Sequence, residues 1–135
     1  VHIAAFFEQP TEAVEWVVSR AGERSYLGDP QVLLENLGTG LSQPTLEPYL
    51  VTLQPGATSG RNIITHGGQE LVYCLQGEVE YEVAGNACLL REGDALLFEA
   101  RHPHRWRNPG SVPARFLMVF GACEDHDSLR RHLGR

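Results

Sequence analysis

The chain has 135 residues, enough for one domain with a hydrophobic core. Its 17 acidic and 11 basic residues give a net charge of −6, which argues against nucleic-acid binding by this segment alone, because phosphate contacts need clustered Lys and Arg. No apolar run approaches the roughly 20 residues of a membrane span. Three cysteines without CxxC spacing or a secretory signal indicate a reduced, cytoplasmic protein.

The N-terminal part is predicted to combine an apolar arm with short strands. Residues 1–12 form the arm or a linker, and EWVVSRAGERSYL (15–27) is predicted as a hairpin around an AGE turn. QVLLENL (31–37) is predicted as a strand. The turn-rich stretch 38–48 is predicted as a loop, and a continuous β pattern begins with LEPYLVTL (46–53).

The rest of the chain carries strand and turn signals at short intervals. EVEYEV (78–83) alternates strictly, with Val79, Tyr81 and Val83 on one face and three glutamates on the other. The AGN that follows is predicted as a tight hairpin turn. Further strands are predicted at RNIIT (61–65), LVYCLQG (71–77) and RFLMVFG (115–121), and on both sides of the EGD turn in ACLLREGDALLFEA (87–100).

These elements together predict the fold class. Many short strands separated by turns every eight to twelve residues or so are typical of an all-β sandwich or barrel. No long helical period interrupts them, which argues against a parallel sheet with crossover helices. We therefore expect an N-terminal arm at 1–12, a β-barrel domain at 13–123 and a polar tail at 124–135 that could form a short helix.

Three residues are candidates for a metal site. The GGQ between His66 and Glu70 favours a tight turn, so that the histidine ends one strand and the carboxylate starts the next. A barrel could bring His104 back to the same point after two more strands. Imidazole and carboxylate together suit a divalent ion such as Zn, Fe, Mn or Ni. The alternative is three unrelated polar residues at strand ends.

Residues 55–120 resemble the cupins, a family of jelly-roll-like barrels built as a double-stranded β-helix. The first cupin motif is G(X)5HXH(X)3–4E(X)6G. Here Glu70 and Gly77 match its end, and His66 falls at its second histidine. Ile64 stands in place of the first histidine, so one of the family's four metal ligands is lost.

The second cupin motif, G(X)5PXG(X)2H(X)3N, is also matched in part. Gly93, His104 and Asn108 fit its spacing, whereas Glu99 and Arg101 replace its proline and glycine. The resemblance therefore implies a three-ligand metal site at His66, Glu70 and His104. The alternative is that the same polar groups contact a small organic ligand in the mouth of the barrel.

A narrower resemblance concerns function. The stretches HGGQELVYCLQGEVEYEV and LREGDALLFEARHPHRWRNPGSVPARFLMV resemble the C-terminal sensor cupin of XRE-type transcriptional regulators. This implies a small-molecule effector, a homodimer, and DNA binding only through a helix-turn-helix domain that is absent from this chain; the missing start Met agrees with that expectation. Two alternatives stay open: a stand-alone metal-dependent enzyme of dioxygenase or isomerase type, and a dimerisation domain without a ligand.

The ligand pocket is expected to be lined by apolar and aromatic side chains, each of which could instead be an ordinary core residue. His102 competes with His104 in the HPH sequence, although the motif spacing favours His104. The arginines at 101, 105 and 107 could attract an anionic effector or lie on a solvated edge strand. The predicted pocket residues are Tyr49, Ile64, Tyr73, Phe98 and Trp106.

Overall fold

The computed structural model describes residues 12–60 and 66–121. These residues form nine strands: β1 (Tyr26–Gly28), β2 (Val32–Asn36), β3 (Leu46–Leu53), β4 (Gln69–Gln76), β5 (Val79–Val83), β6 (Asn86–Leu90), β7 (Ala95–Glu99), β8 (His104–Arg107) and β9 (Ala114–Gly121). None of the described segments is a helix of the length and apolar character needed to cross a bilayer.

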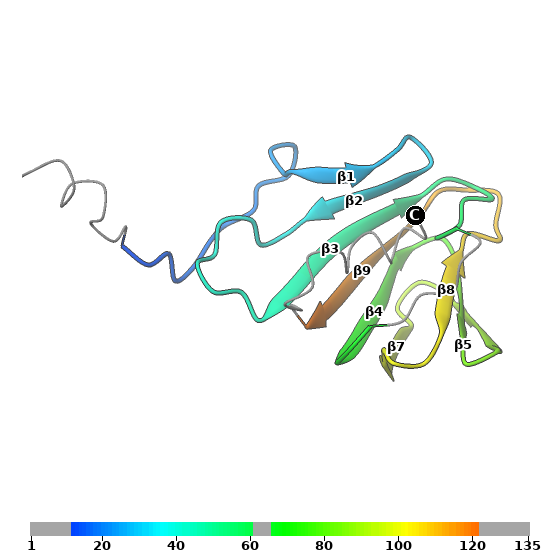
Figure 1. The fold of residues 1–135 in the computed structure, drawn as a ribbon. Helices are drawn as coiled ribbons and strands as arrows, with labels where there is room; N and C mark the ends of the chain where they lie inside the picture. The colour runs from blue at the N-terminus through cyan, green and yellow to red at the C-terminus, as the bar shows by residue number, and fades with distance from the viewer. Residues whose placement is uncertain (1–11, 61–65, 122–135) are drawn as a thin grey trace, which may run out of the picture.

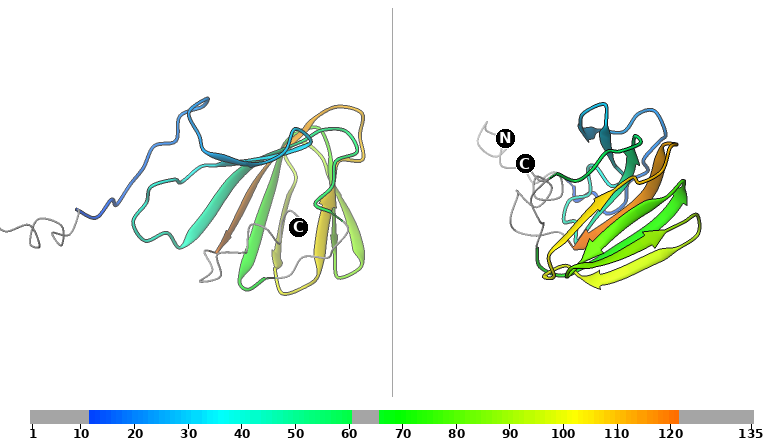
Figure 2. Two further views of the ribbon diagram at one scale, coloured as in Figure 1. Left: turned by 45° about the horizontal axis from the view of Figure 1, so that its top comes forward. Right: turned by 90° about the vertical axis from the view of Figure 1, so that its right-hand side faces the viewer.

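The strands form two antiparallel sheets, shown in Figures 1 and 2. The larger sheet has the order β1-β2-β3-β9-β4-β7, and the smaller has the order β6-β5-β8. Long crossovers place β9 between β3 and β4, so segments far apart in the chain become neighbours. This arrangement confirms the predicted all-β, jelly-roll-like fold.

Inward-facing side chains of both sheets form one hydrophobic core. Val72 and Phe116 enter it from the larger sheet, and Val79, Tyr81 and Trp106 enter it from the smaller one. Burying one such side chain contributes roughly 1.5–3 kcal/mol. The predicted alternation of EVEYEV is confirmed at its first positions, since Val79 and Tyr81 are fully buried and Glu80 between them is not. The core therefore fixes which residues of each strand face the interior.

Two turns depend on glycine. Ala84 and Gly85 join β5 to β6 with φ angles of 50° and 81°, which confirms the predicted hairpin turn, since such turns need positive φ at both central residues. Gly77 ends β4 with a φ of 73°. A Cβ at this position would lie 2.8 Å from the carbonyl oxygen of Pro113, so glycine is required sterically as well.

Part of the N-terminal prediction is wrong. Residues 12–20 contain no strand, so the expected hairpin at 15–27 does not form, and β1 pairs instead with β2. The apolar side chains of the first run lie outside the core, since Trp16 is 78% exposed and Val18 is 56% exposed. The turn between β1 and β2 is built by Asp29, whose carboxylate accepts hydrogen bonds from the backbone N–H groups of Gln31 and Val32.

Other predictions fall partly or wholly outside the described residues. The strand expected at 61–65, the tail at 124–135 and all but the last residue of the arm at 1–12 cannot be placed, and the division of the chain into these segments stays a prediction. The loop expected at 38–48 ends earlier, because β3 begins at Leu46.

Candidate metal and ligand site

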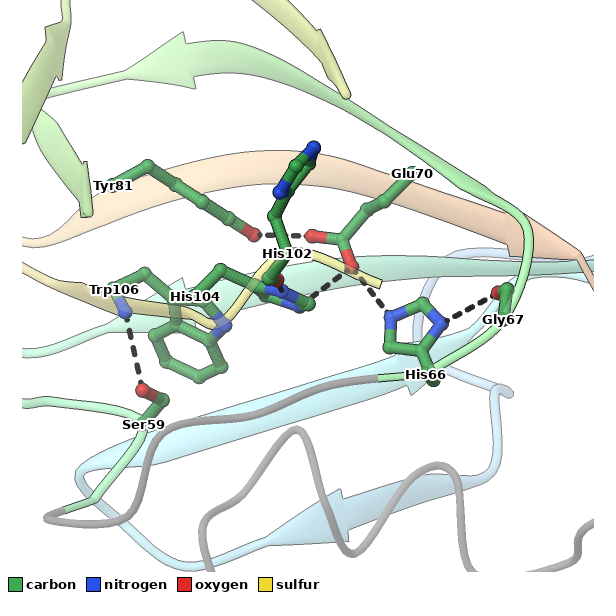
Figure 3. A network of polar contacts seen from close by, with 8 residues as sticks. All are labelled: Ser59, His66, Gly67, Glu70, Tyr81, His102, His104 and Trp106. Carbon is green, nitrogen blue, oxygen red and sulfur yellow. Dashed lines mark hydrogen bonds and ion pairs between the residues drawn. The ribbon is translucent and has the colours of Figure 1, made fainter. Parts of the chain in front are cut away.

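Three of the predicted residues meet inside the barrel, as Figure 3 shows. His66 lies just before β4, Glu70 is the second residue of β4, and His104 is the first residue of β8. All three side chains are buried. One nitrogen or oxygen from each lies within 4.8 Å of the others, so the three could bind the same ion.

A single carboxylate oxygen lies between the two imidazoles. Oε1 of Glu70 is 3.1 Å from Nε2 of His66 and 3.5 Å from Nε2 of His104. The two rings meet edge to face, with their centroids 5.3 Å apart. The site is thus compact and combines two nitrogen ligands with one oxygen ligand.

Backbone carbonyl groups orient both histidines. Nδ1 of His66 lies 3.0 Å from the carbonyl oxygen of Gly67, and Nδ1 of His104 lies 2.8 Å from that of His102. Because a carbonyl oxygen can only accept, each Nδ1 carries a proton and donates it. These bonds turn the Nε2 atom of each histidine toward Glu70, and Nε2 is the atom that would bind a metal ion, as in metal-binding histidines.

Tyr81 orients the carboxylate from the opposite sheet. Its hydroxyl donates a hydrogen bond of 2.9 Å to Oε2 of Glu70. Burial, together with the negative charge of Glu70, raises the pKa of Tyr81 well above its ordinary value, so the hydroxyl keeps its proton. Alternation in the sequence placed Tyr81 in the core, but its role was missed; the available signal was that a buried tyrosine hydroxyl needs an acceptor.

These residues fit a divalent transition metal. Two neutral imidazoles and one carboxylate are ligands that Zn, Fe, Mn and Ni accept, and three protein ligands leave further positions for an exogenous molecule. Aromatic rings pack against the site. The centroid of the Phe98 ring is 4.8 Å from that of His104, and the centroid of the Phe120 ring is 5.2 Å from that of His66. The chemistry of the donors thus supports metal binding, without selecting the ion.

The structure brings together only some of the predicted pocket residues. Phe98 touches the site directly, and Trp106 lies two residues beyond His104 on the same face of β8. Tyr49 lies behind Phe120 as seen from His66, since its ring stacks on that of Phe120, which in turn lies beside His66. Ile64 lies outside the described residues.

Tyr73 requires a correction. It lies on the outer face of β4 and is 40% exposed, because the alternation that turns Glu70, Val72 and Cys74 inward turns Leu71 and Tyr73 outward. It therefore lines no pocket inside the barrel.

Other residues singled out in the sequence stabilise the strands and loops of the barrel. The outward arginines of β8 form ion pairs with β5, Arg105 with Glu82 at 3.0 Å and Arg107 with Glu80 at 2.8 Å, as a solvated edge strand would. The buried Asn108 side chain donates to two backbone carbonyls and accepts from one N–H, so it fastens the loops around it.

Comparison with known proteins gives a matching family model and a related transcriptional regulator. A family model described as a cupin domain (Cupin_2) matches residues 49–120. The HTH-type transcriptional regulator PuuR of Escherichia coli (strain K12) is 27% identical over 116 residues, which make up 85% of this chain and 62% of that protein. The chain therefore spans less than two thirds of this relative's length.

Solved structures support the fold. The Cupin_2 domain of an XRE family transcriptional regulator from Enterobacter cloacae has a TM-score of 0.61 at 22% identity, over 69% of this chain and 98% of that chain. Hydroxypropylphosphonic acid epoxidase from S. wedmorenis has a TM-score of 0.67 at 21% identity, over 77% of this chain and 58% of that chain. A structure of Fe(II)-HppE has a TM-score of 0.65 at 21% identity, over 77% and 59% of the two chains.

Proposed function

Because this chain belongs to the cupin-domain family and is related to the cupin domains of regulators, we propose that it is the small-molecule-sensing domain of a transcriptional regulator. One observation carries the proposal: the buried cluster of His66, Glu70 and His104 inside a regulator-like barrel. An interior of this kind can bind a small effector out of contact with water.

Different residues of the site would bind the metal ion, position its carboxylate ligand and contact the effector. His66, Glu70 and His104 would hold a divalent ion, which when bound offers open positions to an oxygen or nitrogen of the effector. Tyr81 holds the carboxylate in place through Oε2. Phe98 would form an apolar wall beside the effector.

The output of the sensor would be a change in how DNA-reading domains are presented. We place DNA contact in a helix-turn-helix domain outside these 135 residues, consistent with the acidic balance of this segment. A homodimer would couple two such domains, and effector binding would favour one arrangement over the other by its difference in affinity for the two. The exposed Leu71, Tyr73 and Leu97 on the outer face of the larger sheet offer an apolar surface for a second copy of the chain.

Metal content tests the site. We expect about one equivalent of metal in the purified protein, and less than about a tenth of an equivalent in the His104→Ala variant. His102→Ala is the matched control, since it removes the neighbouring imidazole but keeps the carbonyl that orients His104. Wild-type protein without metal, or equal content in wild type and His104→Ala, would contradict a metal-dependent sensor.

The coding sequence tests the regulatory role. We expect an in-frame helix-turn-helix upstream of Val1, and a full-length protein whose affinity for its operator changes when an effector binds. A start codon directly before Val1, with no such domain, would sink the proposal.

An enzyme is the second candidate, because two histidines and one carboxylate with open positions also suit oxygen-dependent or isomerase chemistry. The fate of a bound compound separates the two. After incubation with Fe(II)-loaded protein in air, a sensor releases the compound unchanged, whereas an enzyme releases a product of different mass or retention time. Repeated turnover, abolished by His104→Ala, would favour the enzyme.

A further inference from the structure

The indole of Trp106 carries a buried hydrogen-bond donor without an acceptor. Trp106 is 1% exposed, and within residues 12–60 and 66–121 nothing accepts a hydrogen bond from its Nε1. A donor buried in this way loses its bonds to water and gains none in return, which costs free energy. Such a donor in a native fold therefore calls for an acceptor from outside the described residues.

Several donor groups near this indole do have partners. The backbone N–H of Trp106 itself donates to Oγ of Ser59 at 3.1 Å. The hydroxyl of Tyr81 donates to Glu70, and the amide of Asn108 donates to two backbone carbonyls. The unpaired indole thus lies in an interior that otherwise provides partners for its neighbouring donors.

The indole shares the interior with the metal-ligand cluster. Trp106 follows His104 by two residues on β8 and lies opposite Tyr81 of β5 in the sheet register. Its ring packs edge-on against Phe116, with the centroids 5.8 Å apart. In the view of Figure 3 the side chains of Trp106 and His104 are drawn next to each other. Both enter the barrel from the inner face of β8, so a molecule that extends from the cluster along this face would meet the N–H group of the indole.

We propose that the Trp106 N–H binds an oxygen of the effector, and that the effector is a small carboxylate. The inference rests on the proposed sensor function. One end of the ligand would face the ion held by the cluster, and an oxygen would accept from the indole.

Charge favours a carboxylate over an amine. Two neutral imidazoles and one carboxylate leave a divalent ion with net positive charge, which attracts an anion. An ammonium group would find only Glu70, whose oxygens already face His66 and Tyr81. The buried polar side chains of the described chain are Ser59, His66, Glu70, His104 and Asn108.

The indole signal itself provides the test. The chain has two tryptophans, so Trp16→Phe leaves one indole N–H signal in a ¹H–¹⁵N spectrum. With the full chain carrying this change and loaded with Zn²⁺, we expect acetate to move that signal downfield in a saturable way, and methylammonium to leave it in place. An indole signal that acetate does not move, or that responds equally to methylammonium, would overturn the inference.

Affinity gives a second readout. Trp106→Phe keeps an aromatic ring but removes the donor, and we expect it to weaken acetate binding by about tenfold at equal zinc content. Acetate affinity within about twofold of the Trp16→Phe protein would contradict a direct contact. Zinc content separates a failure of the indole–carboxylate contact from a failure of the metal site itself. A zinc-loaded protein whose indole ignores acetate overturns this inference alone, whereas a protein that binds no zinc overturns the metal site on which both rest.

Discussion

The two faces of β8 use polar residues in opposite ways. His104 and Trp106 point into the barrel and are buried, whereas Arg105 and Arg107 point outward and form ion pairs with glutamates of β5. The outer charges stay partly in water, where an ion pair contributes little. The inner groups have left water, which for a charged group costs on the order of several kcal/mol unless partners compensate.

This difference indicates which residues of RHPHRWR (101–107) belong to the candidate site. Three arginines dominate its charge, and two of them, Arg105 and Arg107, are each paired with a glutamate of β5 on the outer face. The inward polar groups need buried partners, and the described residues supply them only in part, since none of them accepts a hydrogen bond from the indole of Trp106. Buried polar groups, rather than clustered charges, therefore mark the site.

Removing the hydroxyl of Tyr81 should have the largest effect. In Tyr81→Phe the Oε2 atom of Glu70 loses its donor, and the carboxylate is no longer held in one orientation. We expect zinc affinity to fall roughly 10–100-fold, as is typical for partners that orient metal ligands. Competition against a chromophoric chelator measures the affinity.

Tyr73→Phe is the control on the outer face of the sheet. It removes the same atom from an exposed side chain, so its zinc affinity should match that of the wild type. Equal affinities for all three proteins would mean that Tyr81 serves only the core.

Much of the barrel could be predicted because its inward and outward residues differ in polarity. In EVEYEV the glutamates alternate with apolar residues, so both the strand and its inner face follow from the sequence. The meeting of His66, Glu70 and His104 could be predicted because motif spacing relates His104 to Glu70 across two sheets.

The errors occur where this polarity contrast is missing. Both faces of β4 carry apolar residues, so polarity alone did not separate them, and the period of two counted from the predicted ligand Glu70, which places Tyr73 on the outer face, was not applied. The apolar residues near Trp16 resemble a strand but form none in the structure, and Trp16 itself is exposed. The bond between Tyr81 and Glu70 joins two sheets, and no local pattern encodes such a contact.

Buried and exposed tyrosines should also differ in how they affect the stability of the fold at alkaline pH. Burial and the nearby carboxylate of Glu47 raise the pKa of Tyr49 to about 12. The unfolded chain therefore loses this proton first as the pH rises above about 10, and the stabilising contribution of the neutral phenol is lost as the pH approaches 12. The chain contains no lysine, so few other groups titrate in this range.

We expect the wild type to lose about 1 kcal/mol more than Tyr49→Phe between about pH 9 and pH 11. Urea unfolding at the two pH values measures the difference in the free energy of unfolding. Tyr73→Phe, on the exposed face, should behave as the wild type does. A Tyr49→Phe protein with the pH dependence of the wild type would show that the buried phenol ionises normally.

The smallest effect is expected on the outer face of β8. Arg105→Ala removes the ion pair with Glu82, whose two side chains are 45% and 34% exposed. Since both charges remain partly hydrated, the free energy of unfolding should fall by about 0.5 kcal/mol or less, and this loss should be smaller still at high salt, which screens exposed ion pairs. Zinc affinity should not change, because the arginine points away from the cluster. Denaturant unfolding at low and high salt measures the first effect, and the chelator competition measures the second. A loss of zinc affinity comparable with that of Tyr81→Phe would mean that the outer charges support the site and that the two faces of β8 are not independent.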